Sequence, residues 1–318
     1  MRRWLVFSLQ VIVSAALLLL IFRDAGFRAD VAALAGKADV TWLLGAWLVA
    51  GAGCLLGFLR WAIFLRVVGI LESPWSIVRM ASVGLFFNSF LPGAVGGDAV
   101  KVGWLAARGH DPKKALLSVV MDRLSGLGAL ILCSCVFIPP KWSWLTTSAT
   151  VAAMIHFAIV YLLVVVFLLG LSFVMSARGA LESIPPRFPG RASLVEMAST
   201  YRLFVTRWRS TAAASLISAG MLLAYFFTFY FCARAISVVV PAREFLAFMP
   251  AVDIIAALPV SLGGFGVREG VFATVLGELS GVPASAAVSL SFAGALVTLL
   301  WGCLGLLLLP SYRRETKP

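Results

Sequence analysis

The sequence predicts an all-α integral membrane protein, and three observations point to this fold class. Of its 318 residues, 61% are hydrophobic and 13% are charged, whereas a soluble domain has about 45–50% apolar and about 25% charged residues. Apolar stretches long enough to cross about 30 Å of hydrocarbon recur along the chain. The basic residues gather between these stretches, which is typical of cytoplasmic loops. The net charge of +12 is therefore assigned to such loops, and nucleic acid is not an expected partner.

Six apolar stretches are long enough, at roughly 20 residues, to form complete transmembrane helices. The first one follows Arg2 and Arg3 and is longer than the apolar core of about 7–15 residues found in a signal peptide. No small-residue cleavage site follows it, so we expect an uncleaved first span. The six predicted spans are residues 4–22, 40–59, 115–138, 149–175, 211–232 and 287–309.

Two further apolar stretches are interrupted by proline and glycine, and both contain the motif Leu-Pro-x-x-x-Gly-Gly-x-x-x-Lys/Arg. They cover residues 80–106 and 245–283. Since neither proline nor glycine continues a helix cheaply, we expect two re-entrant hairpins. Irregular backbone at membrane depth is tolerated only where protein or a water-filled cavity covers it, which predicts a site between the hairpins. The copies are Leu91, Pro92, Gly96, Gly97 and Lys101, and Leu258, Pro259, Gly263, Gly264 and Arg268.

The distribution of basic residues predicts the orientation of the chain. With both termini in the cytoplasm, 18 of the 26 Lys and Arg residues lie inside, seven lie outside, and Arg123 lies within a span. This is a positive-inside bias. The hairpins would then open to opposite sides, and the single transmembrane domain 1–318 would consist of two inverted repeats, residues 1–138 and 149–318.

Residues 176–210 form the longest predicted cytoplasmic loop. Prolines at 185, 186 and 189 interrupt regular structure, and apolar residues then recur at helical spacing with arginines between them. We expect an amphipathic helix on the anionic inner leaflet, and the alternative is a connecting helix packed on the bundle. The apolar residues are Leu194, Met197, Tyr201, Phe204, Val205 and Trp208.

Each Gly-Gly pair precedes a predicted helix, residues 98–107 and 265–276. A helix N-terminus offers unpaired N–H donors and a positive dipole end. Because Lys101 and Arg268 lie about one turn into these helices, each end is a candidate phosphate site. The alternative is that the glycines only permit close helix packing and the cations only reach the membrane interface.

Ionisable residues inside a membrane are costly and are therefore functional candidates. Arg123 is a further candidate phosphate ligand, and Asp122 is expected to orient a cation, while Asp98 is either a site residue or a helix N-cap. Asp253 and Glu269 are expected to accept protons, which would couple transport to a proton gradient, or to pair with Arg123 and Arg268; a buried structural ion pair is the alternative. The predicted substrate-binding residues are Asn88, Pro92, Gly96, Gly97, Asp98, Lys101, Asp122, Arg123, Asp253, Pro259, Gly263, Gly264, Arg268 and Glu269; Asn88 could also bond the freed backbone at the first break.

The sequence carries no signature of an enzyme, and neither a cofactor nor a metal site is expected. It contains no H-E-x-x-H, G-x-S-x-G or Walker motif. Two histidines leave little for general acid–base chemistry or metal binding. The five cysteines lie in apolar stretches without zinc-type spacing.

These motifs resemble the flippase-like transmembrane region of lysylphosphatidylglycerol synthases and their stand-alone relatives. Three blocks occur in the same order as in that family: residues 87–92 with 96–98, then 122–123, then 258–259 through 263–269. Two departures are Leu262, where the family often has proline, and Asp122, where it commonly has glutamate. The soluble aminoacyl-transfer domain is not expected here, so lysyl transfer is not carried over. The resemblance implies lipid translocation between leaflets, or handling of a lipid-linked substrate.

We therefore expect a flippase-like transporter in a bacterial inner membrane, multi-pass with both termini cytoplasmic. It would move an anionic, phosphate-bearing or glycosylated lipid between leaflets, so its partners are membrane lipids, either a phospholipid or a lipid-linked phosphate. The head group would cross a polar cavity between the hairpins while the tails remain in lipid. The alternatives are an ion-coupled carrier of a small anion, and a membrane enzyme or accessory subunit acting on lipid head groups.

Overall fold

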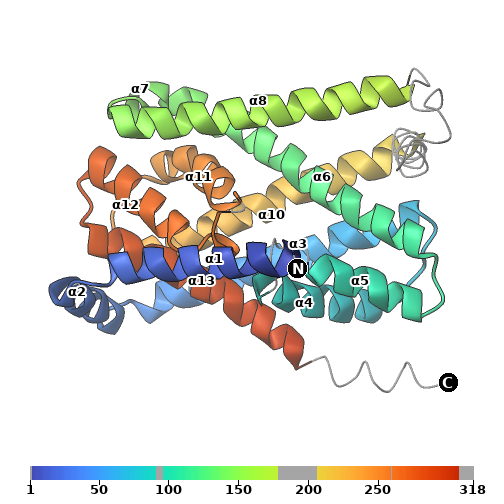
Figure 1. Cartoon of the computed structure of the whole chain (residues 1–318), viewed down its shortest axis with the longest axis horizontal. Helices are drawn as coiled ribbons and strands as arrows, with labels where there is room; N and C mark the ends of the chain where they lie inside the picture. The colour runs from blue at the N-terminus through green and yellow to red at the C-terminus, as the bar shows by residue number, and fades with distance from the viewer. Residues whose placement is uncertain (1, 91–95, 178–205, 259, 308–318) are drawn as a thin grey trace.

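The computed structural model describes residues 2–90, 96–177, 206–258 and 260–307, and within them every regular element is a helix (Figure 1). Five helical segments are long and apolar enough to cross a membrane. They comprise α3 (Val40–Val67), α6 (Pro112–Phe137) with the turns after it, α8 (Ala149–Ala177), α10 (Trp208–Ala235) and α13 (Ala284–Leu306). The predicted all-α membrane fold is confirmed.

These helices coincide with five of the six predicted spans. The remaining predicted span, residues 4–22, corresponds to α1 (Arg2–Ile21). The part of α1 from Val11 to Ile21 is an apolar helix shorter than the five spanning segments. One boundary is wrong. The second span was expected to end at residue 59, but α3 continues to Val67. The reason is that Arg60 is paired inside the protein, so its charge does not end the helix.

Local signals explain where the long helices begin. Asp39 caps α3 by accepting a hydrogen bond from the Thr41 N–H at 2.8 Å, and Asp111 caps α6 in the same way through Lys113 at 2.9 Å. Such caps satisfy N–H groups that a helix start leaves unpaired. Asp24 likewise caps α2 (Ala25–Gly36). At its far end α6 gives way to the turns η2 (Pro139–Lys141) and α7 (Trp142–Leu145).

Both Pro/Gly-containing stretches form two helices joined by a break. The first consists of α4 (Pro74–Phe90) and α5 (Gly96–Ala107). The second consists of α11 (Ala242–Ala256), the short turn η3 (Leu262–Gly264) and α12 (Val267–Ser280). Helix α13 packs against both α4 and α12. The paired helices agree with the predicted hairpins, while their re-entry on one side of the membrane and the inverted repeat stay predictions.

The two glycine pairs serve different purposes. At the second break Gly263 and Gly264 have φ values of 59° and 78°, a region that residues with a Cβ rarely adopt. At the first break, a Cβ on Gly97 would overlap the carbonyl oxygen of Gly84 on α4. The first pair therefore permits close approach of two helices, and the second permits a left-handed turn.

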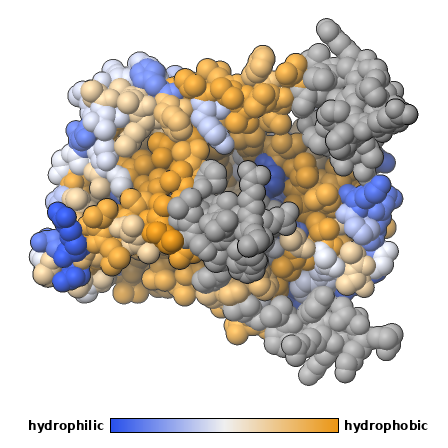
Figure 2. Space-filling model, viewed as in Figure 1, coloured by the Kyte–Doolittle hydropathy of each residue, from blue (hydrophilic) through white to orange (hydrophobic). Residues whose placement is uncertain are grey.

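Apolar side chains cover much of the face seen in Figure 2, and hydrophilic residues gather towards the two ends of that face. On α8, Leu163, Phe167 and Leu168 are more than half exposed. Large exposed apolar surface of this kind is expected on helices that face lipid. Inside, a cluster around Phe226, Phe245 and Phe272 joins α10, α11 and α12.

Some of the basic residues that were counted to predict the orientation of the chain are buried in the structure. Arg60, Arg79 and Lys101, assigned to the cytoplasm by the sequence, are buried in helices, and so is Arg268, assigned to the outside. Removing these three from the 18 leaves 15, and removing Arg268 from the seven leaves six. The bias toward the predicted cytoplasmic side is therefore retained.

We expect single-cysteine labelling of intact cells to follow this bias. In a variant without native cysteines, Ser143→Cys, in the predicted outer loop 139–148, should react with a membrane-impermeant maleimide. Cysteines at the termini and in 176–210 should react only after lysis. The predicted amphipathic helix in this segment falls largely on residues 178–205, outside the described residues, so labelling tests its side of the membrane only. Labelling of Arg187→Cys from outside would contradict the inverted repeat.

Candidate functional site

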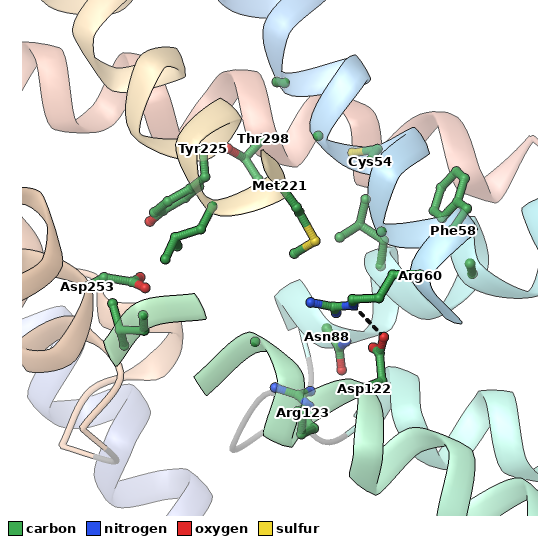
Figure 3. A pocket seen from close by; sticks show the side chains of 18 of the residues that line it. Cys54, Phe58, Arg60, Asn88, Asp122, Arg123, Met221, Tyr225, Asp253 and Thr298 are labelled. Carbon is green, nitrogen blue, oxygen red and sulfur yellow. Dashed lines mark hydrogen bonds and ion pairs between the residues drawn. The ribbon is translucent and has the colours of Figure 1, made fainter. Parts of the chain in front are cut away.

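A cavity of about 620 Å³ lies among α3, α4, α5, α6, α10, α11 and α13 (Figure 3). Most of its wall is apolar or small, including Gly53, Phe58 and Met221. Charged and amide side chains from several helices project into this largely apolar cavity. Six residues predicted from the sequence line it: Asn88, Asp98, Lys101, Asp122, Arg123 and Asp253.

A buried ion pair joins α3 to α6 at the cavity wall. The Arg60 Nε lies 2.7 Å from Asp122 Oδ1, and the two side chains are 8% and 11% exposed. The same guanidinium donates to the hydroxyl of Ser218 on α10 at 3.3 Å. Asp122 thus orients a cation, as predicted, but the cation is Arg60. The sequence predicts Arg60 just beyond the span 40–59, although the apolar run 61–65 that follows it indicates a longer helix.

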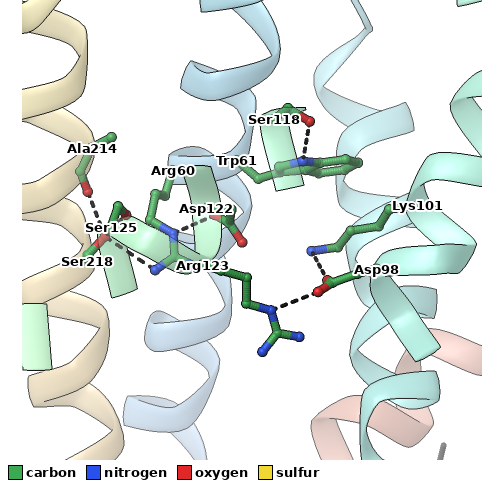
Figure 4. Close-up of polar contacts among 10 residues, drawn as sticks. All are labelled: Arg60, Trp61, Asp98, Lys101, Ser118, Asp122, Arg123, Ser125, Ala214 and Ser218. Atoms are coloured by element: carbon green, nitrogen blue, oxygen red, sulfur yellow. Dashed lines mark hydrogen bonds and ion pairs between the residues drawn. The ribbon is translucent and has the colours of Figure 1, made fainter. Parts of the chain in front are cut away.

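A second charged group joins α5 to α6 (Figure 4). Asp98 Oδ2 lies 2.7 Å from Arg123 Nε, and Asp98 Oδ1 lies 4.0 Å from Lys101 Nζ. The Lys101 ammonium lies 4.8 Å from the ring centroid of Trp61, so the two side chains attract each other through a cation–π interaction. Asp98 lies in the first turn of α5, and its carboxylate contacts two cations.

Together, Arg60, Lys101 and Arg123 contribute three positive charges, whereas Asp98 and Asp122 contribute two negative ones. One positive charge is left over in this part of the cavity. The Arg123 side chain is 49% exposed, while those of Arg60 and Lys101 are 8% and 11% exposed. Arg123 is therefore the cation of the three best placed to meet an incoming anion.

The first break is held by Asn88, whose Oδ1 accepts a hydrogen bond from the Gly97 N–H at 2.9 Å. This is the role that the sequence suggested for Asn88, the capture of freed backbone. At the second break the Gly266 N–H donates to Glu269 Oε2 at 2.6 Å. Each break therefore has one backbone donor that is bound by a side chain.

Arg268 and Glu269 form a separate buried cluster. The Glu269 Oε1 accepts from Ser291 at 2.7 Å and lies 3.4 Å from an Arg268 nitrogen, while Arg268 Nε donates to Ser291 at 3.2 Å. The Arg268 guanidinium also lies over the rings of Phe229 and Phe265. Neither charged residue lines the cavity. The predicted pairing of Glu269 with Arg268 is confirmed.

The predicted glycines Gly96, Gly97, Gly263 and Gly264 do not line the cavity. Gly96 begins α5, and Gly263 and Gly264 form the turn before α12. Pro92 and Pro259 lie outside the described residues. Asp253 lines the cavity from α11 and lies across it from Arg60 and Asp122 (Figure 3).

The sequence analysis also missed Tyr225 on α10, which faces the cavity near Asp253. A tyrosine within an apolar span reads as an ordinary packing residue. Only the arrangement of α10 against α11 gives its hydroxyl a polar neighbourhood, and no signal in the local sequence predicts that arrangement.

Comparison with known proteins agrees with this architecture. The sequence matches the family described as "Lysylphosphatidylglycerol synthase TM region" over residues 7–306. It is also 25% identical to a UPF0104 membrane protein of Pyrococcus horikoshii, across 93% of this chain and 95% of the relative. The match spans all the described helices that surround the cavity. The chain therefore belongs to the family of lysylphosphatidylglycerol synthase transmembrane regions.

Proposed function

We propose that this protein moves an anionic or phosphate-bearing lipid between the leaflets of a bacterial inner membrane. The observation that carries the proposal is the cluster of Arg60, Lys101 and Arg123, which together with Asp98 and Asp122 leaves one positive charge in this part of a largely apolar cavity. Ionisable residues inside a membrane protein are costly, and they commonly mark a substrate pathway. Guanidinium groups bind phosphate through charge-assisted, often bidentate hydrogen bonds.

The apolar remainder of the wall favours a lipid over a small water-soluble anion. Phe58, Leu127, Leu130, Met221 and Leu222 share the cavity with the charged residues. A head group can meet the cations while the first carbons of its tails contact these side chains. A soluble anion gains nothing from such surface, since burial favours apolar groups only.

Proteoliposomes that contain a fluorescent phosphatidylglycerol test this function. Leaflet exchange, followed by quenching of the outer-leaflet dye, is the expected result. Uptake of a small aqueous anion without lipid exchange would favour the ion-coupled carrier. A chemically altered head group, detected by chromatography, would favour an enzyme.

Arg123→Ala is expected to lower lipid exchange roughly ten- to hundredfold, because a hydrogen bond to a charged group is worth about 1.5–3 kcal/mol. Arg123→Lys should recover part of the rate, since lysine keeps the charge but loses the bidentate guanidinium. Rates are compared per correctly folded molecule. Arg66→Ala, which removes an exposed arginine of α3 outside the cavity, is the matched control. A fully active Arg123→Ala would exclude this residue as a head-group ligand.

A further inference from the structure

Asp253 differs from the other carboxylates in the protein's interior. Asp98, Asp122 and Glu269 each form an ion pair with an arginine. Among the residues that the structure describes, the Asp253 side chain has no hydrogen bond or ion pair, although it interacts electrostatically with Arg268. A charged carboxylate without a partner in apolar surroundings is costly, so such a group tends to take up a proton.

The carboxylate of Glu269 is bound directly by its neighbours, whereas the described groups around Asp253 leave its carboxylate without a direct partner. Helix α12 contributes Arg268, α10 contributes Tyr225 and α6 contributes Cys133, and all three interact electrostatically with Asp253. The titratable residues of the described part of α8, His156 and Tyr161, are exposed. Arg268 is the cation among these groups, but it is already paired with Glu269, which also accepts bonds from Gly266 and Ser291.

The protonation of Asp253 changes the charge of the cavity. With Asp253 neutral, the three cations and two carboxylates of the lining leave one positive charge. With Asp253 ionised, a third carboxylate cancels that charge. An anion should therefore bind more tightly when Asp253 is protonated, and by linkage its binding should raise proton occupancy.

We propose that Asp253 is the proton-binding site of this transporter, and that a proton and the anionic head group occupy the cavity together. The inference rests on the proposed function and adds its coupling ion. A metal cation is a poorer occupant, because it needs several oxygen ligands. No group of three or more His, Cys, Asp or Glu residues that could hold a metal occurs in the described part of the chain.

The position of Asp253 within α11 suits a coupling residue. Pro250 lies inside the same helix, three residues earlier. Proline removes one backbone hydrogen bond and weakens the helix where it occurs. The segment that carries Asp253 is therefore a place where α11 can bend when the carboxylate gains or loses its charge.

Binding of dioctanoyl phosphatidylglycerol to the purified full-length protein tests the site directly. The wild-type affinity should fall about tenfold per pH unit above the titration midpoint, because one proton is linked to each anion bound. Asp253→Asn, which mimics the neutral acid, should bind with the same affinity at every pH. Asp253→Glu should restore the pH dependence. Glu244→Gln, on the same helix but outside the cavity, should behave as wild type.

A second measurement separates failure of this proposal from failure of the proposed function. In proteoliposomes, a pH gradient should accelerate net lipid transfer by the wild type but not by Asp253→Asn. If the rate of lipid exchange by the wild type did not depend on pH, or if a sodium gradient drove it, the proposed proton site would be wrong while the proposed flippase function would stand. The same pH dependence for uncharged dioctanoylglycerol would overturn the charge linkage. Absence of both binding and exchange at every pH would overturn the proposed function itself.

Discussion

Gly97→Ala is expected to separate α4 from α5 and to cause one of the largest losses of stability available to a single methyl group in this protein. The Cβ of residue 97 would overlap the carbonyl oxygen of Gly84, and it would also crowd the Asn88 side chain. Backbone cannot yield as the end of a flexible side chain can, so the two helices must shift. Overpacking of this kind costs about 1–3 kcal/mol, and sometimes more.

The same shift should damage the site, because Asp98 follows Gly97 directly. A displaced Asp98 loses its 2.7 Å contact with Arg123, and Asn88 loses its bond to the Gly97 N–H. We therefore expect Gly97→Ala to lower both the melting temperature in detergent and the lipid exchange of the surviving folded protein.

Gly103→Ala is the matched control on the same helix. No atom lies within 4 Å of a Cβ at this position, and the backbone does not require glycine. Alanine should be neutral or stabilising by about 0.5–1 kcal/mol, the usual gain in a helix interior. If the Gly97 and Gly103 variants melted at the same temperature, the close contact between α4 and α5 would not limit stability.

Hydropathy, together with the prolines and glycines that interrupt helices, was enough to predict the helices around the cavity. Membrane spans follow from length and apolar content because lipid offers the backbone no hydrogen bonds, so these properties are local in sequence. The breaks at residues 91–97 and 258–264 were equally visible, since Pro and Gly cannot continue a helix cheaply.

The pairing of charges was harder to predict, because it depends on contacts between distant helices. Arg60 reaches Asp122 and Ser218, which are 62 and 158 residues away. The motif repeat also suggested that Lys101 and Arg268 are equivalent. In the structure Lys101 lines the cavity, whereas Arg268 is enclosed by Glu269, Ser291 and two phenylalanines. The repeated motif predicts a break in each pair of helices, but the backbone conformation at the glycines and the partners of the cations differ between the two copies.

The Arg60–Asp122 pair allows the structural and functional roles of a buried charge to be separated. Asp122→Leu alone should destabilise the protein by about 3–5 kcal/mol, because it leaves the Arg60 guanidinium buried without its carboxylate. Arg60→Met alone should cost a similar amount for the opposite reason. The double variant removes both charges, so its stability should return to near that of the wild type, as often happens when a buried pair is replaced by apolar residues.

Lipid exchange should not return with stability in the double variant. Lys101, Arg123 and Asp98 would still leave one positive charge, so the net charge of this part of the cavity is unchanged. What is lost is the guanidinium of Arg60 in the cavity wall. With it goes a head-group contact, and its loss should lower the rate of lipid exchange roughly tenfold.

Chemical unfolding and lipid exchange per folded molecule measure the two effects separately. As a control, Lys141→Met breaks an ion pair outside the cavity and should leave lipid exchange per folded molecule unchanged. A stable double variant with full exchange would show that Arg60 and Asp122 only hold α3 against α6, and that the head group depends on Lys101 and Arg123 alone.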